Sequence, residues 1–336
     1  MSTKKAWTPG PHPEFSISHR VIDMLEWCPR KFRHDVHTSW LGWIARGEPG
    51  PDGQPVADEA RLAYRLKKLT SLHAVIGTAA HLEAERFVKA VRDDAPLPGY
   101  EEVRARLQGA LNRAYTASLN RSAFLRSPKA HAMVFSAYYS GRPSIAELES
   151  AQAKVDPIAR GICESEFWSE IQGLEKEEHR AIETLDWFDF EGVRINVKAD
   201  LITAHVDGDV QIVDFKTTRD DEAPHLVQLS LYALYATTKL GLDFQPGYWR
   251  GLVVNFLGRT SEYILEERHL EQAADRLRRA IREIRGYLAD PATNEPRAVE
   301  DFPLVNRAQM EGCRWCPFLQ LCAPELPPRI SGSWLR

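Results

Sequence analysis

Two aspartates and a lysine stand on consecutive predicted strands in the second half of the chain. Side chains alternate between faces along a strand, so Asp214 and Lys216 share one face of the predicted strand that begins at Val210. Asp200 lies on the preceding predicted strand, and the turn at Asp207-Gly208 links the two strands. Two carboxylates and an amine in this pattern could bind a divalent cation and act on a phosphate ester.

The length of the connecting turn decides whether the two carboxylates meet. A two-residue turn at Asp207-Gly208 sets Asp200 across from Phe215, with the carboxylates on opposite sides of the sheet. A three-residue loop with a left-handed Gly208 sets Asp200 directly across from Asp214. The spacing permits both registers.

In the second register the paired residues would have Cβ atoms only ~4.5–5.5 Å apart, and the carboxylates would repel each other unless a cation lay between them. Oxygen ligands favour Mg²⁺ or Mn²⁺, which polarises a phosphate and lowers the pKa of a bound water. Lys216 would position that water and stabilise the developing charge. The alternative is a surface hairpin whose Asp and Lys form an exposed ion pair of little energetic value.

These residues belong to a longer pattern: Asp200, then Asp214-Phe215-Lys216-Thr217-Thr218, then Gln228-x-x-x-Tyr232, with Gly77-Thr78-Ala79-Ala80-His81 upstream. The pattern resembles the RecB-like branch of the PD-(D/E)XK nucleases. That resemblance implies that His81, Asp200 and Asp214 bind the metal and that Asp200, Asp214 and Lys216 are catalytic. It also places Gln228 and Tyr232 near the substrate strand.

Three of these assignments are weaker when the residues are considered alone. His81 on an alanine-rich helix would ordinarily be a packed or exposed histidine. Gln228 and Tyr232, four residues apart, are neighbours on one helix face and could be a simple packing pair. The resemblance also suggests Glu166 as an additional strand carboxylate, for which we expect no large role.

A second constellation consists of cysteines. Cys313-x2-Cys316-x5-Cys322 together with Cys28 supplies four thiolates, the number that a [4Fe-4S] cluster requires, and Cys163 is the spare. Zinc is the alternative, although structural zinc sites usually contain paired knuckles and not one isolated ligand. The arrangement is similar to the cluster of AddB-type nucleases. A cluster would close a loop of ~285 residues and so reduce the entropy of the unfolded chain.

The basic residues Arg30, Lys31 and Arg33 beside Cys28, with Arg314 and Trp315 in the terminal motif, could contact a single strand or could form a solvated face. Composition excludes little: the net charge is −4, so a nucleic acid would have to be held by a local basic groove. No segment has the ~18 apolar residues of a membrane span, and the N-terminal residues lack the pattern of a signal peptide. We therefore expect a cytoplasmic protein.

Hydrophobic periodicity predicts a mostly helical first half and a second half that begins with strands. Ser18 is a candidate N-cap for a helix through Cys28. Further helices are predicted at 57–92, 99–121, 145–158, 223–240 and 270–288, and strands at 163–171, 181–190, 193–206, 210–217, 248–256 and 263–266.

We divide the chain into a tail (1–14), a helix with the first cysteine (15–45), a helical region with His81 (46–160), a nuclease core (161–290), a cluster segment (291–323) and a second tail (324–336). The expected fold is α/β, a restriction-endonuclease-like core with a mixed central sheet flanked by helices and a large N-terminal helical insertion. We expect the helical part to narrow access to the metal, and such enclosure suits the end of a strand. We therefore predict an Mg²⁺- or Mn²⁺-dependent exonuclease that acts on single-stranded DNA in repair, recombination or phage DNA metabolism. A CRISPR adaptation nuclease and a non-catalytic DNA-binding subunit of a helicase complex are the alternatives.

Overall fold

The computed structural model describes residues 9–218 and 225–332. The helices are α1 (His19–Trp27), α2 (Pro29–Phe32), the π-helix η1 (Arg33–Thr38), α3 (Asp58–Lys67), α4 (Leu72–Arg92), α5 (Tyr100–Ser118), α6 (Arg121–Arg126), α7 (Phe135–Ser140), α8 (Ile145–Gln152), α9 (Val155–Cys163), α10 (Phe167–Ile171), α11 (His225–Thr238), α12 (Glu267–Gly286), α13 (Leu319–Cys322) and α14 (Pro328–Ser331). Short 3₁₀ turns are η2 (Lys176–Glu178), η3 (Val299–Asp301), η4 (Met310–Trp315) and η5 (Ala323–Glu325).

The strands form two larger sheets and two short pairs. They are β1 (Ser16–Ser18), β2 (Leu69–Thr70), β3 (Met133–Val134), β4 (His179–Ile182), β5 (Leu185–Phe190), β6 (Val193–Lys198), β7 (Leu201–Ala204), β8 (Val210–Lys216), β9 (Trp249–Asn255), β10 (Ser261–Ile264), β11 (Leu288–Asp290) and β12 (Glu295–Pro296). The main sheet has the order β10-β9-β8-β7-β4, and only its β8–β9 pair is parallel. The fold is therefore mixed α/β.

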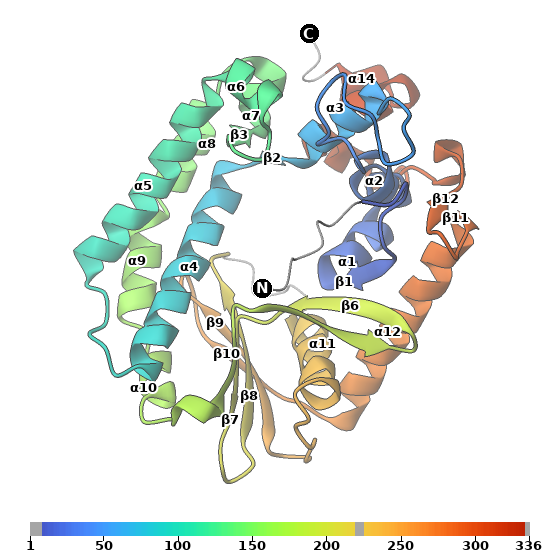
Figure 1. Ribbon diagram of the computed structural model, residues 1–336. Coiled ribbons are helices and arrows are strands. Elements are labelled where there is room, and N and C mark those ends of the chain that lie inside the picture. Colours follow the sequence, from blue (N-terminus) through green and yellow to red (C-terminus); the bar gives the residue numbers. More distant parts are fainter. Residues whose placement is uncertain (1–8, 219–224, 333–336) are drawn as a thin grey trace, which may run out of the picture.

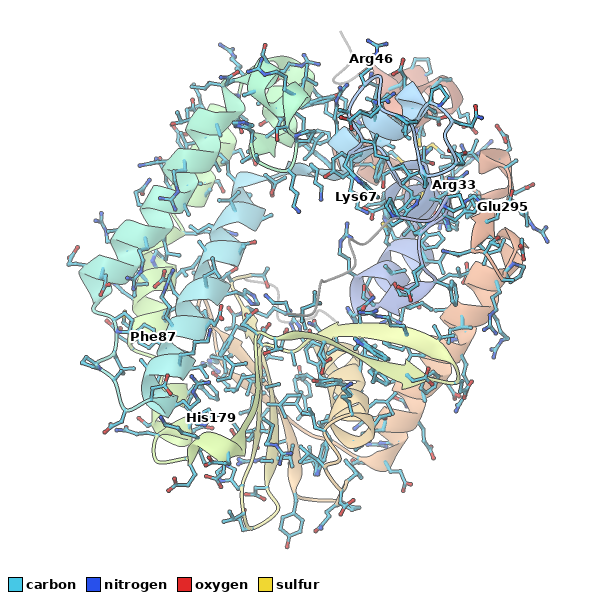
Figure 2. The ribbon with its side chains drawn as sticks, in the orientation of Figure 1. Arg33, Arg46, Lys67, Phe87, His179 and Glu295 are labelled. Carbon is cyan, nitrogen blue, oxygen red and sulfur yellow. The ribbon has the colours of Figure 1, made fainter. Side chains whose placement is uncertain are left out.

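The main sheet is covered by helices on both faces because β8 and its neighbours are apolar on both sides. Val213 and Phe215 belong to the hydrophobic cluster of α4, α5 and α9, whereas Ile212 belongs to the cluster of α11 and α12. In Figure 1 the α4–α5–α9 layer and the α12 side form two arms that rise from the sheet and meet near α3, α6 and α14. Figure 2 shows Phe87 on the first arm, with Lys67 and Arg33 on the second.

Two predicted strands are each divided between the two sheets. The segment predicted as one strand at 193–206 breaks at Ala199-Asp200, so that β6 pairs with β1 and β5 while β7 pairs with β4 and β8. The predicted strand at 181–190 breaks at Glu183, whose φ is +46°. Glu183 and Asp200 therefore both lie where the chain passes from one sheet to the other.

The strand predicted at 163–171 is wrong. This segment contains the end of α9 and the helix α10, because Phe167, Trp168 and Ile171 recur at helical spacing and are all buried. Glu166 precedes α10 and is exposed, so it is not the additional strand carboxylate.

Several predicted helices are real but interrupted. The helix expected at 57–92 is broken by β2, and the one expected at 145–158 is divided between α8 and α9. Ser18 caps α1 by accepting from the backbone N–H of Val21. Cys28 then ends α1 and caps α2, its sulfur accepting from the N–H of Lys31 at 3.4 Å. The predicted helix 223–240 begins outside the described residues, and α11 occupies its remainder.

The C-terminal stretch expected to be a tail packs against the cysteine segment instead. Leu326 and Ile330 are buried in one cluster with Cys28, Cys313 and Cys322. Residues 333–336 of that predicted tail, and 1–8 of the N-terminal one, lie outside the described part of the chain. No described helix is long and apolar enough to cross a membrane.

Direct contacts join the N-terminal helices to the C-terminal segment. The Nε of Arg30 donates to the carbonyl of Phe302 at 2.8 Å, and its guanidinium forms an ion pair with Glu325. Asn294 donates to the carbonyl of Pro13 at 2.8 Å. Arg30 is therefore a buried structural residue, and the interpretation of it as a strand-contacting cation is wrong.

A pair of helical glycines tests the packing of α9 on the sheet. A Cβ at Gly161 would lie 2.0 Å from the carbonyl oxygen of Phe256. Phe256 in turn is fixed to the sheet, because its backbone N–H donates to the carbonyl of Lys216. A Cβ at Gly109 would meet only the flexible end of Arg113. We expect Gly161→Ala to lower the free energy of unfolding by about 1–3 kcal/mol and Gly109→Ala to raise it by up to about 1 kcal/mol. Urea denaturation measures both, and equal effects would contradict this packing.

Candidate active site

The hairpin before the site adopts the three-residue loop. Gly208 has φ +99°, and the N–H of His205 bonds to the carbonyl of Asp209 at 2.8 Å. The ladder pairs Leu201 with Val213, so extending it by one residue sets Asp200 across from Asp214. Of the two registers that the sequence allowed, the structure has the one that brings the aspartates together.

Asp200 links the two strands through its own side chain. Its Oδ2 accepts the backbone N–H of Phe215 at 2.7 Å, so the carboxylate lies beside the strand segment that carries Asp214 and Lys216. Asp200 is 5% exposed and Asp214 is 1% exposed. Two acids are therefore buried at the same end of β7 and β8.

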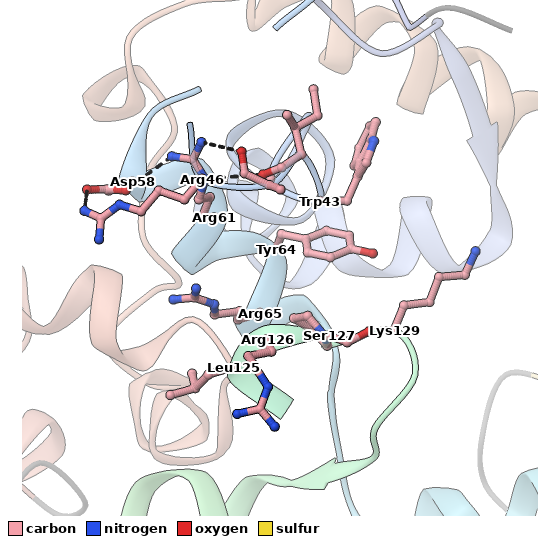
Figure 3. A pocket seen from close by; sticks show the side chains of 14 residues that line it. Trp43, Arg46, Asp58, Arg61, Tyr64, Arg65, Leu125, Arg126, Ser127 and Lys129 are labelled. Carbon is pink, nitrogen blue, oxygen red and sulfur yellow. Dashed lines mark hydrogen bonds and ion pairs between the residues drawn. The ribbon is translucent and has the colours of Figure 1, made fainter. Parts of the chain in front are cut away.

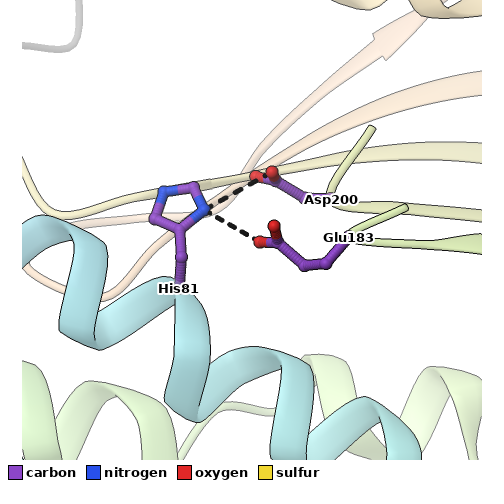
Figure 4. Close-up of side chains that lie close together, drawn as sticks. All are labelled: His81, Glu183 and Asp200. Atoms are coloured by element: carbon purple, nitrogen blue, oxygen red, sulfur yellow. Dashed lines mark hydrogen bonds and ion pairs between the residues drawn. The ribbon is translucent and has the colours of Figure 1, made fainter. Parts of the chain in front are cut away.

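A third carboxylate, which the sequence analysis missed, completes a compact group. Ligand atoms of His81, Glu183 and Asp200 all lie within 4.8 Å of one another (Figure 4). The Nδ1 of His81 is 3.1 Å from Oε1 of Glu183 and 3.4 Å from Oδ1 of Asp200. Three such groups converging in one place could bind a metal ion.

Glu183 reaches this position because it directly follows β4 in the strand next to β7. Its N–H bonds to the carbonyl of Asp200 at 3.0 Å, and its backbone is left-handed, a strained state for a residue with a side chain. The sequence contained a signal, an acid after the apolar pair Ala181-Ile182, but the predicted continuous strand concealed the break.

The small residues of the helix α4 bring His81 to the sheet. Ala79 and Ala80 are buried, and Gly77 lies close to β8, where an added Cβ would be 3.4 Å from Oγ1 of Thr217. The ring of His81 also packs edge-on against Phe215, with centroids 6.4 Å apart. The motif from Gly77 to His81 therefore lies where α4 packs closely against the sheet.

The acids and bases of this group change one another's protonation. Burial lowers the pKa of His81, but its hydrogen bonds to Asp200 and Glu183 outweigh that effect and raise the pKa to about 10. Burial raises the pKa of Glu183, yet His81 and Lys198 together hold it below its usual value. The two carboxylates therefore favour the protonated, cationic form of His81.

Asp214 begins a chain of polar contacts that leads to α11. Its Oδ2 lies 2.6 Å from Nζ of Lys216, which donates to Oε1 of Gln228 at 3.3 Å. The amide of Gln228 donates to the hydroxyl of Tyr232 at 2.7 Å. Gln228 and Tyr232 are therefore connected to the candidate catalytic lysine, and burial is the main reason that the pKa of Tyr232 is raised.

The donor set fits a divalent metal ion. Neither carboxylate oxygen of the buried Asp214 has a well-aligned hydrogen-bond donor among the described residues. Burial, followed by the charge of Asp200, raises its pKa to about 6, and Lys216 only partly offsets this. Carboxylates and an imidazole are groups that can bind Mg²⁺ or Mn²⁺, and the poorly compensated charge of Asp214 favours such an ion. Asp214 is not in the compact group of three, but it is electrostatically coupled to it through Asp200.

The four candidate cluster cysteines are all buried, and three share one apolar cluster. Cys28, Cys313 and Cys322 lie together, and burial followed by the charge of the other cysteines raises the pKa of Cys322. Burial raises the pKa of Cys316 to about 12, with Lys31 acting in the opposite direction. Cys163 is only partly buried, and its pKa responds to Glu164 and Glu83 instead.

These thiols do not form a compact ligand group of the kind that His81 belongs to. Among the described residues, the one compact group of metal-ligating side chains is that of His81, Glu183 and Asp200, and it contains no cysteine. The structure therefore shows a buried region lined by cysteines from both ends of the chain.

Residues 57–323 match the family described as the PD-(D/E)XK nuclease superfamily, which is more than half of the chain. The protein belongs to this superfamily. No curated protein matches it.

Two solved structures are similar to the chain at low identity. One, described as SSO0001, has 14% identity and a TM-score of 0.27, covering 79% of this chain and 95% of the other. The second, a candidate exonuclease from Eubacterium rectale, has 12% identity and a TM-score of 0.28, covering 66% and 94%.

The raised pKa of Asp214 predicts how the stability of the protein depends on pH. Because its pKa is raised to about 6, the folded state binds this proton more tightly than the unfolded state, and stability falls as pH rises from about 4 to 6. Asp214→Asn removes the charge, so we expect it to increase the stability of the metal-free protein at pH 8 by roughly 1–3 kcal/mol and to have little effect at pH 4.

Urea denaturation at the two pH values in EDTA measures this difference. The exposed Asp243 serves as the matched control, and Asp243→Asn should change stability little at either pH. A destabilised Asp214→Asn protein at pH 8 would show that the carboxylate is already compensated without a metal.

Proposed function

We propose that the protein is a metal-dependent deoxyribonuclease that hydrolyses phosphodiester bonds of single-stranded DNA from an end. The observation that carries the proposal is the convergence of buried acids from three neighbouring strands, Glu183, Asp200 and Asp214, with Lys216 beside them. Membership of the PD-(D/E)XK nuclease superfamily supports the same chemistry.

His81, Asp200 and Asp214 would hold Mg²⁺ or Mn²⁺, and Glu183 is a further ligand that the geometry adds to this set. When bound, the ion would polarise the phosphate and increase the acidity of a water molecule. A metal at His81 requires the imidazole to lose a proton that its pKa of about 10 favours retaining, so the ion must compete with that proton.

The roles of the other side chains follow from their contacts. Lys216, with its Nζ between Asp214 and Gln228, would orient the attacking water and stabilise negative charge on the phosphate. Gln228 is fixed on its other side by Tyr232, so the amide has one defined orientation toward Lys216. Lys198 neutralises Glu183 and limits the negative charge that an approaching phosphate would meet.

Action at strand ends is supported by the position of the site between the two arms of the fold. His81 comes from α4 in one arm, whereas α11, which carries Gln228, lies on the side of the other (Figure 1). A site placed between two layers suits a flexible single strand better than a rigid duplex, because a strand can be threaded by its end.

We expect Asp214→Ala and Lys216→Ala each to lower the rate of Mn²⁺-dependent degradation of a labelled single-stranded oligonucleotide by about 10²–10⁴-fold. Labels at the 5′ and 3′ ends report the polarity, and a circular single strand should resist if an end is required. Asp243→Ala controls for removal of an acid, and circular dichroism checks folding. Full activity of both variants would refute the assignment.

We also propose that Cys28, Cys313, Cys316 and Cys322 bind a [4Fe-4S] cluster. Support comes from their number, their shared burial and the cations Arg30 and Lys31 nearby, which offset the charge of thiolates. Three of the four, Cys28, Cys313 and Cys322, share one buried apolar cluster although they come from opposite ends of the chain. The cluster would link the N-terminal helices to the C-terminal segment.

Protein purified without oxygen should be brown, with about four iron atoms per chain. Cys28→Ala should lose the colour and iron and decrease the free energy of unfolding by about 2–5 kcal/mol, because a cross-link between distant segments is lost. Cys163→Ala should retain both colour and iron. Colourless protein with one zinc, or equal effects of the two substitutions on iron content, would contradict the proposal.

A further inference from the structure

A basic pocket lies apart from the candidate active site, at the junction of the two arms. It has a volume of about 690 Å³ and is formed by the loop around Trp43, the helix α3 and the end of α6 (Figure 3). Its full lining is Gly42, Trp43, Ile44, Ala45, Arg46, Asp58, Arg61, Tyr64, Arg65, Leu125, Arg126, Ser127, Pro128 and Lys129. None of the candidate metal or cluster ligands belongs to it.

The positive charge of this pocket is largely uncompensated. Its lining contains five cationic side chains but a single carboxylate, Asp58, which is 3.1 Å from Arg46 and 3.3 Å from Arg61. Arg65, Arg126 and Lys129 have no carboxylate partner among the described residues. Such a concentration is unexpected in a chain whose net charge is −4.

The side chains around the pocket indicate the same positive field. After burial, the charges of Lys67 and Lys129 are the next causes that lower the pKa of Lys68. Lys68 also lies 5.2 Å from the ring centroid of Tyr64. Asp35 offsets part of this charge through its ion pair with Lys67, and the remaining excess of cations favours a polyanion.

Aromatic side chains accompany these cations. Trp43 is 40% exposed, and edge-on contacts hold its ring against Trp40 at 4.8 Å and Tyr64 at 6.0 Å between centroids. A rigid, exposed aromatic ring beside several cations is the combination that binds the bases and phosphates of a single strand.

The pocket and the metal centre stand on consecutive elements. Tyr64 and Arg65 are on α3, which leads through β2 into α4, and His81 is on α4. With a rise of ~1.5 Å per residue, Leu72 to His81 spans ~14 Å. With the ~3.4 Å rise per nucleotide of a stacked strand, about four nucleotides would cover that length.

We propose that this pocket binds a single-stranded segment of the DNA substrate at a distance from the scissile bond, with Arg65, Arg126 and Lys129 on its phosphates and Trp43 against a base. The proposal rests on the proposed nuclease function, since it assigns a second contact for the same substrate. Such a contact would let a protein of net charge −4 hold a strand after a cleavage.

The test uses the double variant Arg126→Gln/Lys129→Gln of the full chain. Binding of a fluorescent 30-nucleotide single strand is measured by anisotropy in EDTA, so that no cleavage occurs. We expect affinity to fall by about 10-fold and the slope of log affinity against log salt to decrease by ~1.4, about 0.7 for each lost phosphate contact. Unchanged affinity and slope would overturn the proposal.

The matched control is Arg113→Gln/Arg282→Gln, which removes two exposed cations of α5 and α12 outside the pocket. An equal loss of affinity in this control would also overturn the proposal, because it would reflect charge alone. Because the binding arm needs no turnover, it decides the pocket's role even if the protein proves to have no nuclease activity.

Two kinetic comparisons complete the test. In Mn²⁺ the pocket variant should have a raised KM for the 30-nucleotide strand with unchanged kcat, and unchanged kinetics on a trinucleotide too short to extend from the metal centre to the pocket. Equal losses on both substrates would contradict a separate site. Oligonucleotides with 5′-phosphate or 5′-hydroxyl ends distinguish a terminal from an internal phosphate as the ligand, because only a terminal one makes the defect depend on that end.

Discussion

The structure around the candidate site depends on one electrostatic constraint, the burial of three acids at the ends of adjacent strands. Two like charges about 4 Å apart repel by ~4 kcal/mol at an effective dielectric constant of 20. Glu183, Asp200 and Asp214 therefore need cations, and the protein supplies His81, Lys198 and Lys216. The compensation is uneven, since Asp214 retains a raised pKa while Glu183 has a lowered one.

The same constraint explains why the helical region is attached where it is. His81 is the only one of the three compensating cations that comes from outside the strands and their junctions, and it arrives on α4, whose small residues allow contact with β8. An arm that is docked through the charge of His81, near the middle of α4, places α3 and the basic pocket beyond the N-terminal end of that helix. The first half of α4 therefore separates His81 from the pocket.

The sequence indicated which residues belong to the candidate site better than how they are arranged. The identities and order of Asp200, Asp214 and Lys216 follow from alternation along strands, but two hairpin registers were equally compatible with the residues. A left-handed Gly208 suits both, and only the pairing of His205 with Asp209 and of Leu201 with Val213 distinguishes them. Glu183 was missed because strand propensity is local. The break that directs its side chain into the site depends instead on which sheet each half of the segment joins. For the same reason the segment at 163–171, rich in apolar residues, could be mistaken for a strand.

The two ends of the chain are held together by more than cysteines. Arg30 donates to the carbonyl of Phe302 and forms an ion pair with Glu325. These contacts themselves hold the N-terminal helices against the C-terminal segment. A cluster bound by Cys28 and the terminal cysteines would therefore change the folded geometry little. Its main effect would be on the unfolded chain, where it prevents the ends from separating. Since one arm of the fold ends in this junction, that cross-link would stabilise the arm and leave the arrangement of the candidate site to the sheet.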